Sequence, residues 1–358
     1  MAGSRGLLAM ADGQPVDPSI VDPEILRAWM DGKGLGTGPL ERLEAITGGT
    51  QNLLLRFTRD GRTYVLRRPP EHKRTNSDET MRREARVLSA LAGSDVPHPG
   101  FIASEPDEAV LGAAFYLMES IDGFQATAEL PSLHAGDPMV RRAMGLSFVD
   151  AILALHAVES ETGALDSFGK PDGYLERQVP RWQAQLDSYN ELQGYPGPEL
   201  PHLDDIQAFL EQNRPDPSPT GIIHGDYHLA NVMFQHDRGE IAAIVDWELA
   251  TCGDPLIDLG LIVAFWPEAD GDAGMMSVQP WEGFPTIDEM VRHYDERSPR
   301  SVEALDWYAV LACYKTGIIL EGTHARAFAG KAAKEFGDLL HETTVGLFEK
   351  AGRIIQRG

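Results

Sequence analysis

The spacing of apolar residues changes along the chain and divides it into a strand-rich first third and a helix-rich remainder. Residues 43–68 contain strand-forming runs around a Gly-Gly pair and an Asp-Gly turn, which predicts three short strands. Residues 115–121 form a further run of strand length. Beyond these runs the apolar positions recur with helical spacing. The helices expected there cover residues 138–157, 174–190, 203–212, 286–296 and 301–325.

Two helix starts in the first third carry capping residues. Asp22 and Pro23 introduce a short helix, which glycines at positions 32, 34, 36 and 38 bring to an end. Asn76 and Glu79 have the spacing of a capping box at the start of a helix that continues through Leu91. The residues before the first helix, 1–20, are small and polar and contain proline, so we expect a flexible tail there.

One β-hairpin is predicted inside the helical part, with its turn at residues 236–239. Antiparallel pairing about this turn would bring Asn231 and Asp246 side by side at the open end of the hairpin. Asp226 lies in the polar loop just before the hairpin. Two hard oxygen ligands and a free carboxylate at one point predict a Mg²⁺–phosphate site with a base beside it.

These motifs resemble the aminoglycoside phosphotransferase and choline kinase branch of the kinase-like fold. The resemblance rests on His224-Gly225-Asp226 with Asn231, on Ile244-Val245-Asp246-Trp247-Glu248 and on residues 253–260, and it extends upstream to residues 48–52 and 64–70. Residues 173–178 resemble a subgroup that includes the kinase-like domains fused to some acyl-CoA dehydrogenases. In all, the resemblance covers about residues 20–330.

The resemblance implies an α+β, two-lobed, protein-kinase-like fold. The N-lobe would cover residues 21–119, and the mainly helical C-lobe, with its embedded catalytic hairpin, residues 120–358. The implied activity is ATP-dependent transfer of the γ-phosphoryl group to a hydroxyl of a small molecule. Asp226 would be the catalytic residue, and Asn231 and Asp246 would hold Mg²⁺. Asp258 would bind backbone N–H groups of the catalytic loop.

The nucleotide is expected to bind in the N-lobe. A glycine-containing turn lets backbone N–H groups approach phosphates, and here it comprises Gly48, Gly49, Thr50, Gln51 and Asn52. The resemblance favours Arg67 over Arg68 as the phosphate ligand, with Glu84 orienting it. The structural alternative is that Glu84 only forms an exposed pair on its own helix. Adenine would be held by the carbonyl of Glu119 and the N–H of Ile121.

The acceptor is expected to bind against the predicted helix 301–325, because the hairpin and the strands already form the phosphate site. Lys315 interrupts an apolar run there and needs a partner or an anionic ligand. Segment 266–296 carries eight acidic residues and is either a lid suited to a polycation or a solvated surface. We predict a neutral or anionic acceptor, such as a hydroxyacyl compound, rather than an aminoglycoside. The candidate acceptor-binding residues are Tyr314, Lys315, Glu321 and Arg326.

Composition narrows the classes of partner. The 55 acidic and 31 basic residues give a net charge of −24, which argues against nucleic acid or an anionic membrane as a partner. The two cysteines cannot form a disulfide framework and suggest a reducing compartment. No apolar run approaches the ~20 residues of a membrane span, and the first residues are too weakly apolar for a signal peptide. We therefore expect a soluble, cytoplasmic protein.

Two rival functions remain open from the sequence. In the first, the chain is a catalytically idle kinase-like module that binds a nucleotide or metabolite, although neither the base nor a metal ligand has been lost. In the second, His224, Asp226 and His228 hold a transition metal in a hydrolase, since alternate positions of an extended segment project the same way. That arrangement leaves Asn231 and Asp246 without a role. The identity of the acceptor and the oligomeric state cannot be determined from the sequence.

Overall fold

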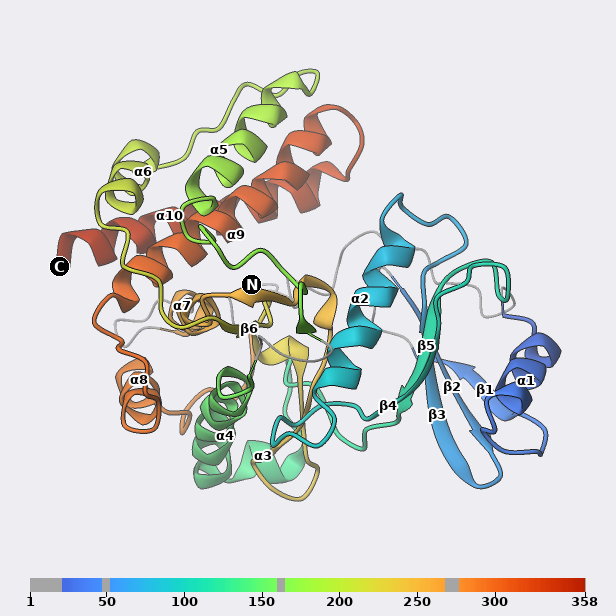
Figure 1. The fold of residues 1–358 in the computed structure, drawn as a ribbon. Helices are drawn as coiled ribbons and strands as arrows, with labels where there is room; N and C mark the ends of the chain where they lie inside the picture. The colour runs from blue at the N-terminus through green and yellow to red at the C-terminus, as the bar shows by residue number, and fades with distance from the viewer. Residues whose placement is uncertain (1–20, 47–51, 160–164, 268–276, 358) are drawn as a thin grey trace.

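The strand-rich and helix-rich parts of the chain form two lobes in the computed structural model (Figure 1). The structure describes residues 21–46, 52–159, 165–267 and 277–357. The N-lobe contains α1, α2 and one antiparallel sheet, and the C-lobe contains the remaining helices with two short strand pairs. This is the two-lobed α+β architecture that the sequence predicts. The tail expected over residues 1–20 lies outside the described residues.

The N-lobe sheet has the strand order β1-β2-β3-β5-β4. Its strands are β1 (Glu41–Ala45), β2 (Leu53–Arg59), β3 (Arg62–Arg68), β4 (Phe101–Glu105) and β5 (Phe115–Glu119). Strands β2 and β3 form the predicted hairpin, in which Asp60 and Gly61 both have positive φ. Such a two-residue turn matches the right-handed twist of the strands that it joins. The predicted Gly48-Gly49 turn lies outside the described residues.

Helices α1 (Pro23–Gly32) and α2 (Ser77–Ala90) cover opposite faces of this sheet (Figure 1). Successive strand residues point to opposite faces, so each strand contributes to two separate cores. Leu66 of β3 packs in the core that includes α1, whereas Tyr116 of β5 packs in the core that includes α2. On β3 this alternation also directs Arg67 toward α2, whose inner face faces the C-lobe.

The two predicted caps differ in outcome. Asp22 caps α1 by accepting hydrogen bonds from the backbone N–H groups of Glu24 at 2.8 Å and Ile25 at 3.3 Å. The capping box predicted at Asn76 is wrong, because the Asn76 side chain makes no capping hydrogen bond. Its backbone is not in the extended conformation that favours capping, with φ −102° and ψ 5°. A capping box forms instead at the start of α8, between Thr286 and Glu289.

The C-lobe is a set of helices packed around two small β units (Figure 1). Its helices are α3 (Ser132–Gly136), α4 (Pro138–His156), α5 (Gln178–Ser188), α6 (Leu203–Gln212), α7 (Leu256–Phe265), α8 (Ile287–Asp295), α9 (Leu305–Phe328) and α10 (Lys334–Arg357). The predicted helix 174–190 begins later than expected, at Gln178, and helices α7 and α10 were not predicted. Helix α7 is apolar almost all round, so it has no polar face from which a helical period could be recognised.

The β units of the C-lobe carry the sequence motifs. Strands β7 (Val232–Phe234) and β8 (Ile241–Ile244) form the predicted hairpin, and β6 (Gly221–Ile223) pairs with β9 (Thr251–Gly253). The 3₁₀ turns are η3 (Tyr189–Glu191), η4 (Leu229–Asn231) and η5 (Trp247–Leu249). None of the helices in the described segments has the length and apolar character needed to cross a membrane.

Candidate active site

A buried ion pair joins β3 to α2 in the N-lobe. The Arg67 Nε lies 2.9 Å from the Glu84 Oε2, and the two side chains are only 10% and 1% exposed. The hydroxyl of Tyr116 donates a hydrogen bond to the same carboxylate at 2.7 Å. Glu84 is therefore not an exposed helix residue, and the alternative of a solvated pair on its own helix is wrong. The strand–helix pair expected from the resemblance is present.

Arg67 also reaches across to the C-lobe, where its Nη2 lies 2.7 Å from the Asp246 Oδ1. Burial by itself lowers the pKa of the Arg67 guanidinium, but Glu84, Tyr116 and Asp246 outweigh it and the pKa lies above its usual range. Arg68 points the other way and donates to the carbonyl of Leu111 at 2.9 Å. Only Arg67 of the two adjacent arginines thus faces the space between the lobes.

The loop of residues 224–226, called the catalytic loop because it carries the candidate catalytic residue Asp226, is held by Asp258 of α7. This carboxylate is fully buried and accepts the backbone N–H groups of His224 at 2.6 Å and Gly225 at 2.8 Å. The role that the resemblance implied for Asp258 is confirmed. Gly225 has φ +85°, and a Cβ there would lie 2.8 Å from the carbonyl oxygen of Leu249, so this position requires glycine.

Lys315 of α9 also holds this loop, through a backbone carbonyl oxygen. Its Nζ donates a hydrogen bond to the carbonyl oxygen of Gly225 at 2.9 Å and lies 5.9 Å from the centre of the Trp182 ring. Burial lowers the pKa of Lys315, while the charges of Asp226 and Asp258 oppose that shift. The partner that an interior lysine requires is therefore the loop itself, next to Asp226.

Asp226 and Asn231 form one hydrogen-bonded unit. The Asn231 Nδ2 donates to both the carbonyl oxygen and the Oδ2 of Asp226, each at 2.9 Å. His228 contacts the same carboxylate, with its Nε2 3.4 Å from the Asp226 Oδ2. Burial would raise the pKa of Asp226, but His228, Lys315 and His224 lower it to about 2. Asp226 is consequently a carboxylate throughout the neutral pH range, and its side chain is 38% exposed.

Asp246 follows strand β8, and the strand pairing before it is shifted by one residue from the predicted pairing. Val232 pairs with Ile244, and the N–H of Val245 donates to the carbonyl of Asn231 at 2.8 Å, so Val245 rather than Asp246 lies opposite Asn231. A bulge shifts the register between Met233 and Phe234. Asp246 adopts a left-handed conformation, with φ 64° and ψ 67°, which costs about 1–3 kcal/mol in a non-glycine residue and is typical of functional sites.

Glu248 is a further carboxylate at this point that the sequence analysis did not select. Burial raises the pKa of Glu248 to about 7, and repulsion by Asp246, Glu84 and Asp226 acts in the same direction, while Arg67 opposes it. The sequence signal for Glu248 was its place two residues after Asp246. Only the folding of η5 brings it into the field of the other carboxylates. The site therefore holds excess negative charge that a divalent cation would neutralise.

The rival transition-metal site at His224, Asp226 and His228 does not form. Both ring nitrogens of His224 are already engaged, Nε2 with the carbonyl of Val245 at 3.0 Å and Nδ1 with the N–H of Asp226 at 3.3 Å. The His228 Nδ1 accepts the N–H of Ala230 at 3.2 Å. These histidines hold the loop in shape, and within the described segments the group of His and carboxylate residues with metal-ligand spacing lies elsewhere.

The remaining nucleotide-binding candidates lie at the edges of the described structure. Gly48, Gly49, Thr50 and Gln51 are outside the described residues, and Asn52 is half-buried at the start of β2. Glu119 ends β5, where its N–H donates to the carbonyl of Gly100 at 2.8 Å and its side chain pairs with Arg62 at 3.1 Å. Ile121 follows in the chain that leads to the C-lobe, where Phe124 forms a β-bridge with Phe234 of the hairpin.

The four acceptor candidates do not share one site. Tyr314 is fully buried, with its hydroxyl 3.1 Å from Gln207 and 3.2 Å from Gln183, so it packs α9 against α5 and α6. Glu321 is also fully buried, and Arg326 is on the last turn of α9, where it bonds to Thr323. Tyr314 and Glu321 are thus corrections to the predicted set, because helix-face polarity alone could not separate packing residues from ligand-facing ones. Of the four candidates, Lys315 is the one for which the described structure shows a hydrogen bond to the loop of residues 224–226.

The predicted acidic segment 266–296 is only partly described, since residues 268–276 lie outside the described residues. In the described part, Glu289 caps α8 and pairs with Arg142 at 2.9 Å. This carboxylate therefore has a structural role on the surface.

Comparison with known proteins identifies the fold and the family. The sequence profile of the phosphotransferase enzyme family matches residues 42–302. A Ralstonia eutropha crystal structure, provisionally assigned as an aminoglycoside phosphotransferase, is 29% identical, with a TM-score of 0.78 over 94% of this chain and 98% of that one. This similarity confirms the predicted protein-kinase-like fold.

A more distant structure and a longer relative complete the comparison. The ternary complex of a thermostable aminoglycoside phosphotransferase APH(4)-Ia mutant with AMP-PNP and hygromycin B is 16% identical, with a TM-score of 0.52 over 90% of this chain and 99% of that one. Acyl-CoA dehydrogenase family member 10 from Mus musculus is 27% identical over 96% of this chain and 32% of its own length. The chain thus spans about a third of that relative.

Glu248→Gln should change how stability depends on pH. The folded-state pKa of about 7 lies above the ordinary 4.5, so the folded protein binds the proton more tightly. Wild-type stability should therefore fall as pH rises from about 5 to above 7, and the variant should lose this fall and be the more stable protein at about pH 8. Calorimetric melting without divalent cations is the measurement, with exposed Glu303→Gln as control. Identical pH profiles for wild type and Glu248→Gln would contradict the assignment.

Proposed function

The chain belongs to the phosphotransferase enzyme family, and from this premise we propose that it is an ATP-dependent O-phosphotransferase acting on a small molecule. The observation that carries the proposal is the convergence of two units at the junction of the lobes. One is the Glu84–Arg67–Asp246 chain of ion pairs, and the other is the Asp226–Asn231 pair on the catalytic loop. A cation, two candidate metal ligands and a free carboxylate are the parts that phosphoryl transfer requires.

Asp226 would orient the acceptor hydroxyl. Its contacts with Asn231 and His228 both use Oδ2, which leaves Oδ1 to accept a hydrogen bond from the hydroxyl. A carboxyl whose pKa is about 2 is a weak base, so it would take the proton only after most of the bond to phosphorus has formed. In a loose transition state the main contribution of such a residue is position rather than basicity.

The carboxylates and the amide around Asp246 fit a divalent cation. Asn231 directs its amide nitrogen to Asp226, which leaves its amide oxygen as a candidate ligand, and the backbone of Asn231 pairs with Val245, the residue before Asp246. Glu248 lies in the field of Asp246. Oxygen donors with excess negative charge are the set that Mg²⁺ prefers. When bound, Mg²⁺ would neutralise charge on the nucleotide phosphates. Arg67 would carry a fixed positive charge toward the same phosphates, held in place by Glu84.

The proposed acceptor is a hydroxyacyl compound. Lys315 provides positive charge next to Asp226. Burial is the main cause of the lowered pKa of Lys315, and the nearby charge of Arg181 lowers it further. These two cations, Lys315 next to Asp226 and Arg181 near Lys315, are separate from the carboxylates that would hold the metal, and they disfavour a polycationic aminoglycoside and suit a neutral or anionic molecule. The similarity to an acyl-CoA dehydrogenase family member supports acyl chemistry, although this chain spans about a third of that protein.

The direct test is transfer of labelled phosphate from ATP to a panel of acceptors. Hydroxyacyl thioesters and hydroxy acids should be phosphorylated in preference to choline-like alcohols and kanamycin-type amines. Asp226→Asn should keep the fold and Mg·ATP binding but lower kcat by at least about 100-fold, because the positioned carboxylate is lost.

Three outcomes of this panel would count against the proposal. Near-normal kcat in Asp226→Asn would exclude that residue as the catalytic one. Turnover of kanamycin-type amines alone would overturn the acceptor class. Mg·ATP binding without turnover of any acceptor would favour a nucleotide-binding regulatory module.

Asn231→Ala and Asp246→Ala should both weaken the binding of Mg·ATP. The loss should be larger for Asp246→Ala, because this residue contributes a full negative charge to the cation and Asn231 only a dipole. Calorimetric titration with Mg·ATP, compared with titration of ATP in a chelator, measures the metal-dependent part. Unchanged affinity in Asp246→Ala would remove Asp246 from the metal site.

Arg67→Ala and Arg68→Ala form a matched pair, since both remove a buried arginine from β3. Arg67→Ala should raise KM for ATP and lower kcat, because its guanidinium faces the lobe junction. Arg68→Ala should lower the melting temperature with little change in ATP kinetics, since its bonds are to the carbonyls of Pro69 and Leu111. ATP kinetics impaired by Arg68→Ala and normal in Arg67→Ala would reverse the assignment.

A further inference from the structure

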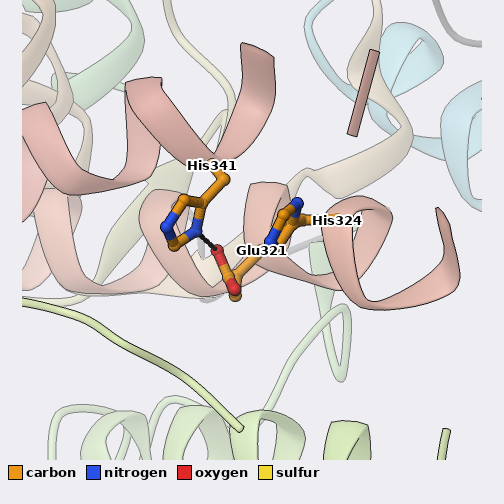
Figure 2. A group of neighbouring side chains, drawn as sticks. All are labelled: Glu321, His324 and His341. Atoms are coloured by element: carbon orange, nitrogen blue, oxygen red, sulfur yellow. Dashed lines mark hydrogen bonds and ion pairs between the residues drawn. The ribbon is translucent and has the colours of Figure 1, made fainter. Parts of the chain in front are cut away.

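A cluster of one carboxylate and two imidazoles lies between the two longest helices, at the end of α9 that leads into α10. Figure 2 shows Glu321 and His324 on α9 facing His341 on α10. Glu321 and His324 are three residues apart, so they lie on the same helix face one turn from each other. One ligand atom from each of the three residues lies within 4.8 Å of the other two. Neither the catalytic loop nor the proposed metal site at Asp246 includes these residues.

We propose that Glu321, His324 and His341 form a binding site for a divalent transition-metal ion of the zinc class. Two histidines and one glutamate are a known ligand set for four-coordinate zinc with one position left for water. Imidazole nitrogen selects Zn²⁺ and its neighbours over Mg²⁺ and Ca²⁺, which prefer oxygen alone. The site is thus chemically distinct from the all-oxygen site proposed for Mg²⁺, and the proposal does not depend on the phosphotransferase activity.

The carboxylate of Glu321 is prepared as a ligand. It is fully buried, and a carboxylate taken out of water needs strong partners to compensate for the lost hydration. Its Oε1 accepts a hydrogen bond from the hydroxyl of Tyr195 at 2.7 Å, and its Oε2 lies 2.7 Å from the His341 Nδ1. Tyr195 therefore acts as the outer partner that fixes the orientation of a metal-binding carboxylate.

The two imidazole rings lie close together and nearly parallel. Their centres are 4.4 Å apart with an interplanar angle of 19°. An imidazole binds a metal through a nitrogen lone pair, and this arrangement brings one nitrogen of each ring to the same point as the Glu321 carboxylate. The His324 Nδ1 is buried and makes no hydrogen bond with any residue that the structure describes. Phe328 packs edge-on against the His324 ring, with the two ring centres 5.1 Å apart, and limits the rotation of that ring.

A candidate fourth ligand, which would take the position otherwise left to water, and an entry path lie on the solvent side. Asp338, on α10, has its Oδ1 3.5 Å from the His324 Nδ1, and its side chain is 43% exposed. Asp338 also pairs with Lys334, which a metal-bound Asp338 would release. The side chains of His324 and His341 are 12% and 25% exposed, so solvent reaches the cluster. A metal and its water can therefore enter without unfolding the helices.

A metal at this site would tie together three separate parts of the C-lobe. Two ligands come from α9 and one from α10, and Tyr195 lies in the segment between η3 and α6. Lys315 is six residues before Glu321 on α9, about 9 Å along a helix with a rise of 1.5 Å per residue. The helix that anchors the catalytic loop would thus gain a fixed point near its other end, which makes the site structural rather than catalytic.

The test is metal binding by the full chain after removal of metals with a chelator. Zn²⁺ should bind with one-to-one stoichiometry in a calorimetric titration and raise the melting temperature. Co²⁺ should give the visible absorption of a four- or five-coordinate ion that Zn²⁺ then abolishes. His324→Ala and His341→Ala should each lower the Zn²⁺ affinity at least about 100-fold, and Tyr195→Phe, which removes only an outer partner, about 10-fold.

Two further variants separate this site from other histidines. His293→Gln removes a comparable histidine–carboxylate pair, with Asp150 at 2.6 Å, and should bind Zn²⁺ as the wild type does. His228→Ala tests the catalytic loop and should also leave the Co²⁺ spectrum unchanged. The proposal is overturned if the wild type does not bind Zn²⁺ at micromolar concentration, or if His324→Ala and His341→Ala bind it as tightly as the wild type. Loss of the Co²⁺ spectrum in His228→Ala alone would overturn it as well.

Discussion

The arrangement of the two lobes depends on the pair of salt bridges that the Arg67 guanidinium makes with Glu84 and Asp246. The Arg67 side chain is 10% exposed and lies between Glu84 of the N-lobe and Asp246 of the C-lobe, at 2.9 and 2.7 Å. A buried charge that loses one partner costs about 3–5 kcal/mol, so both carboxylates must stay in place. The same requirement fixes the position of α2 against β3 and of the hairpin end against the N-lobe. The junction between the lobes is thereby defined electrostatically and not only by packing.

The catalytic loop is held by a second set of buried polar contacts. Asp258 accepts hydrogen bonds from two backbone N–H groups of the loop. Lys315 donates a hydrogen bond to the carbonyl oxygen of Gly225, the residue before Asp226. Because these contacts involve backbone atoms, they fix the path of the loop without occupying the carboxylate of Asp226. Helices α7 and α9, which carry the two anchors, are among the most extensively buried elements of the C-lobe. The rigidity of the helical core is thus passed directly to the residue proposed to orient the acceptor.

The charges at the site are balanced only in part. Asp226 has partners that lower its pKa, whereas burial, and then the charges of neighbouring carboxylates, raise the pKa of Glu248. Neighbouring acids with such different environments divide the roles of a site, one staying ionised and the other responding to a cation. The carboxylate of Glu321 has different partners from the carboxylates of the active site. The hydroxyl of Tyr195 and the imidazole of His341 hold it, rather than the side chains of arginine or lysine. The two proposed cation sites, one made of oxygen ligands and one containing two imidazoles, can therefore coexist in one lobe.

The sequence by itself determined the two-lobed fold and the position of the hairpin, because strand and helix periods and turn residues act locally. The resemblance to the family's motif favoured Arg67 over Arg68, and the alternation of side chains along β3 is what places Arg67 against Glu84. Only the tertiary structure decided which polar residues of α9 face the catalytic loop. Lys315 reaches it while Tyr314 packs against α5 and α6, a difference of one helical position that depends on which elements surround the helix. The raised pKa of Glu248 likewise arises first from its burial and then from the charges of Asp246, Glu84 and Asp226. Burial and the approach of Glu84 and Asp226 depend on the tertiary structure, so no local pattern encodes them.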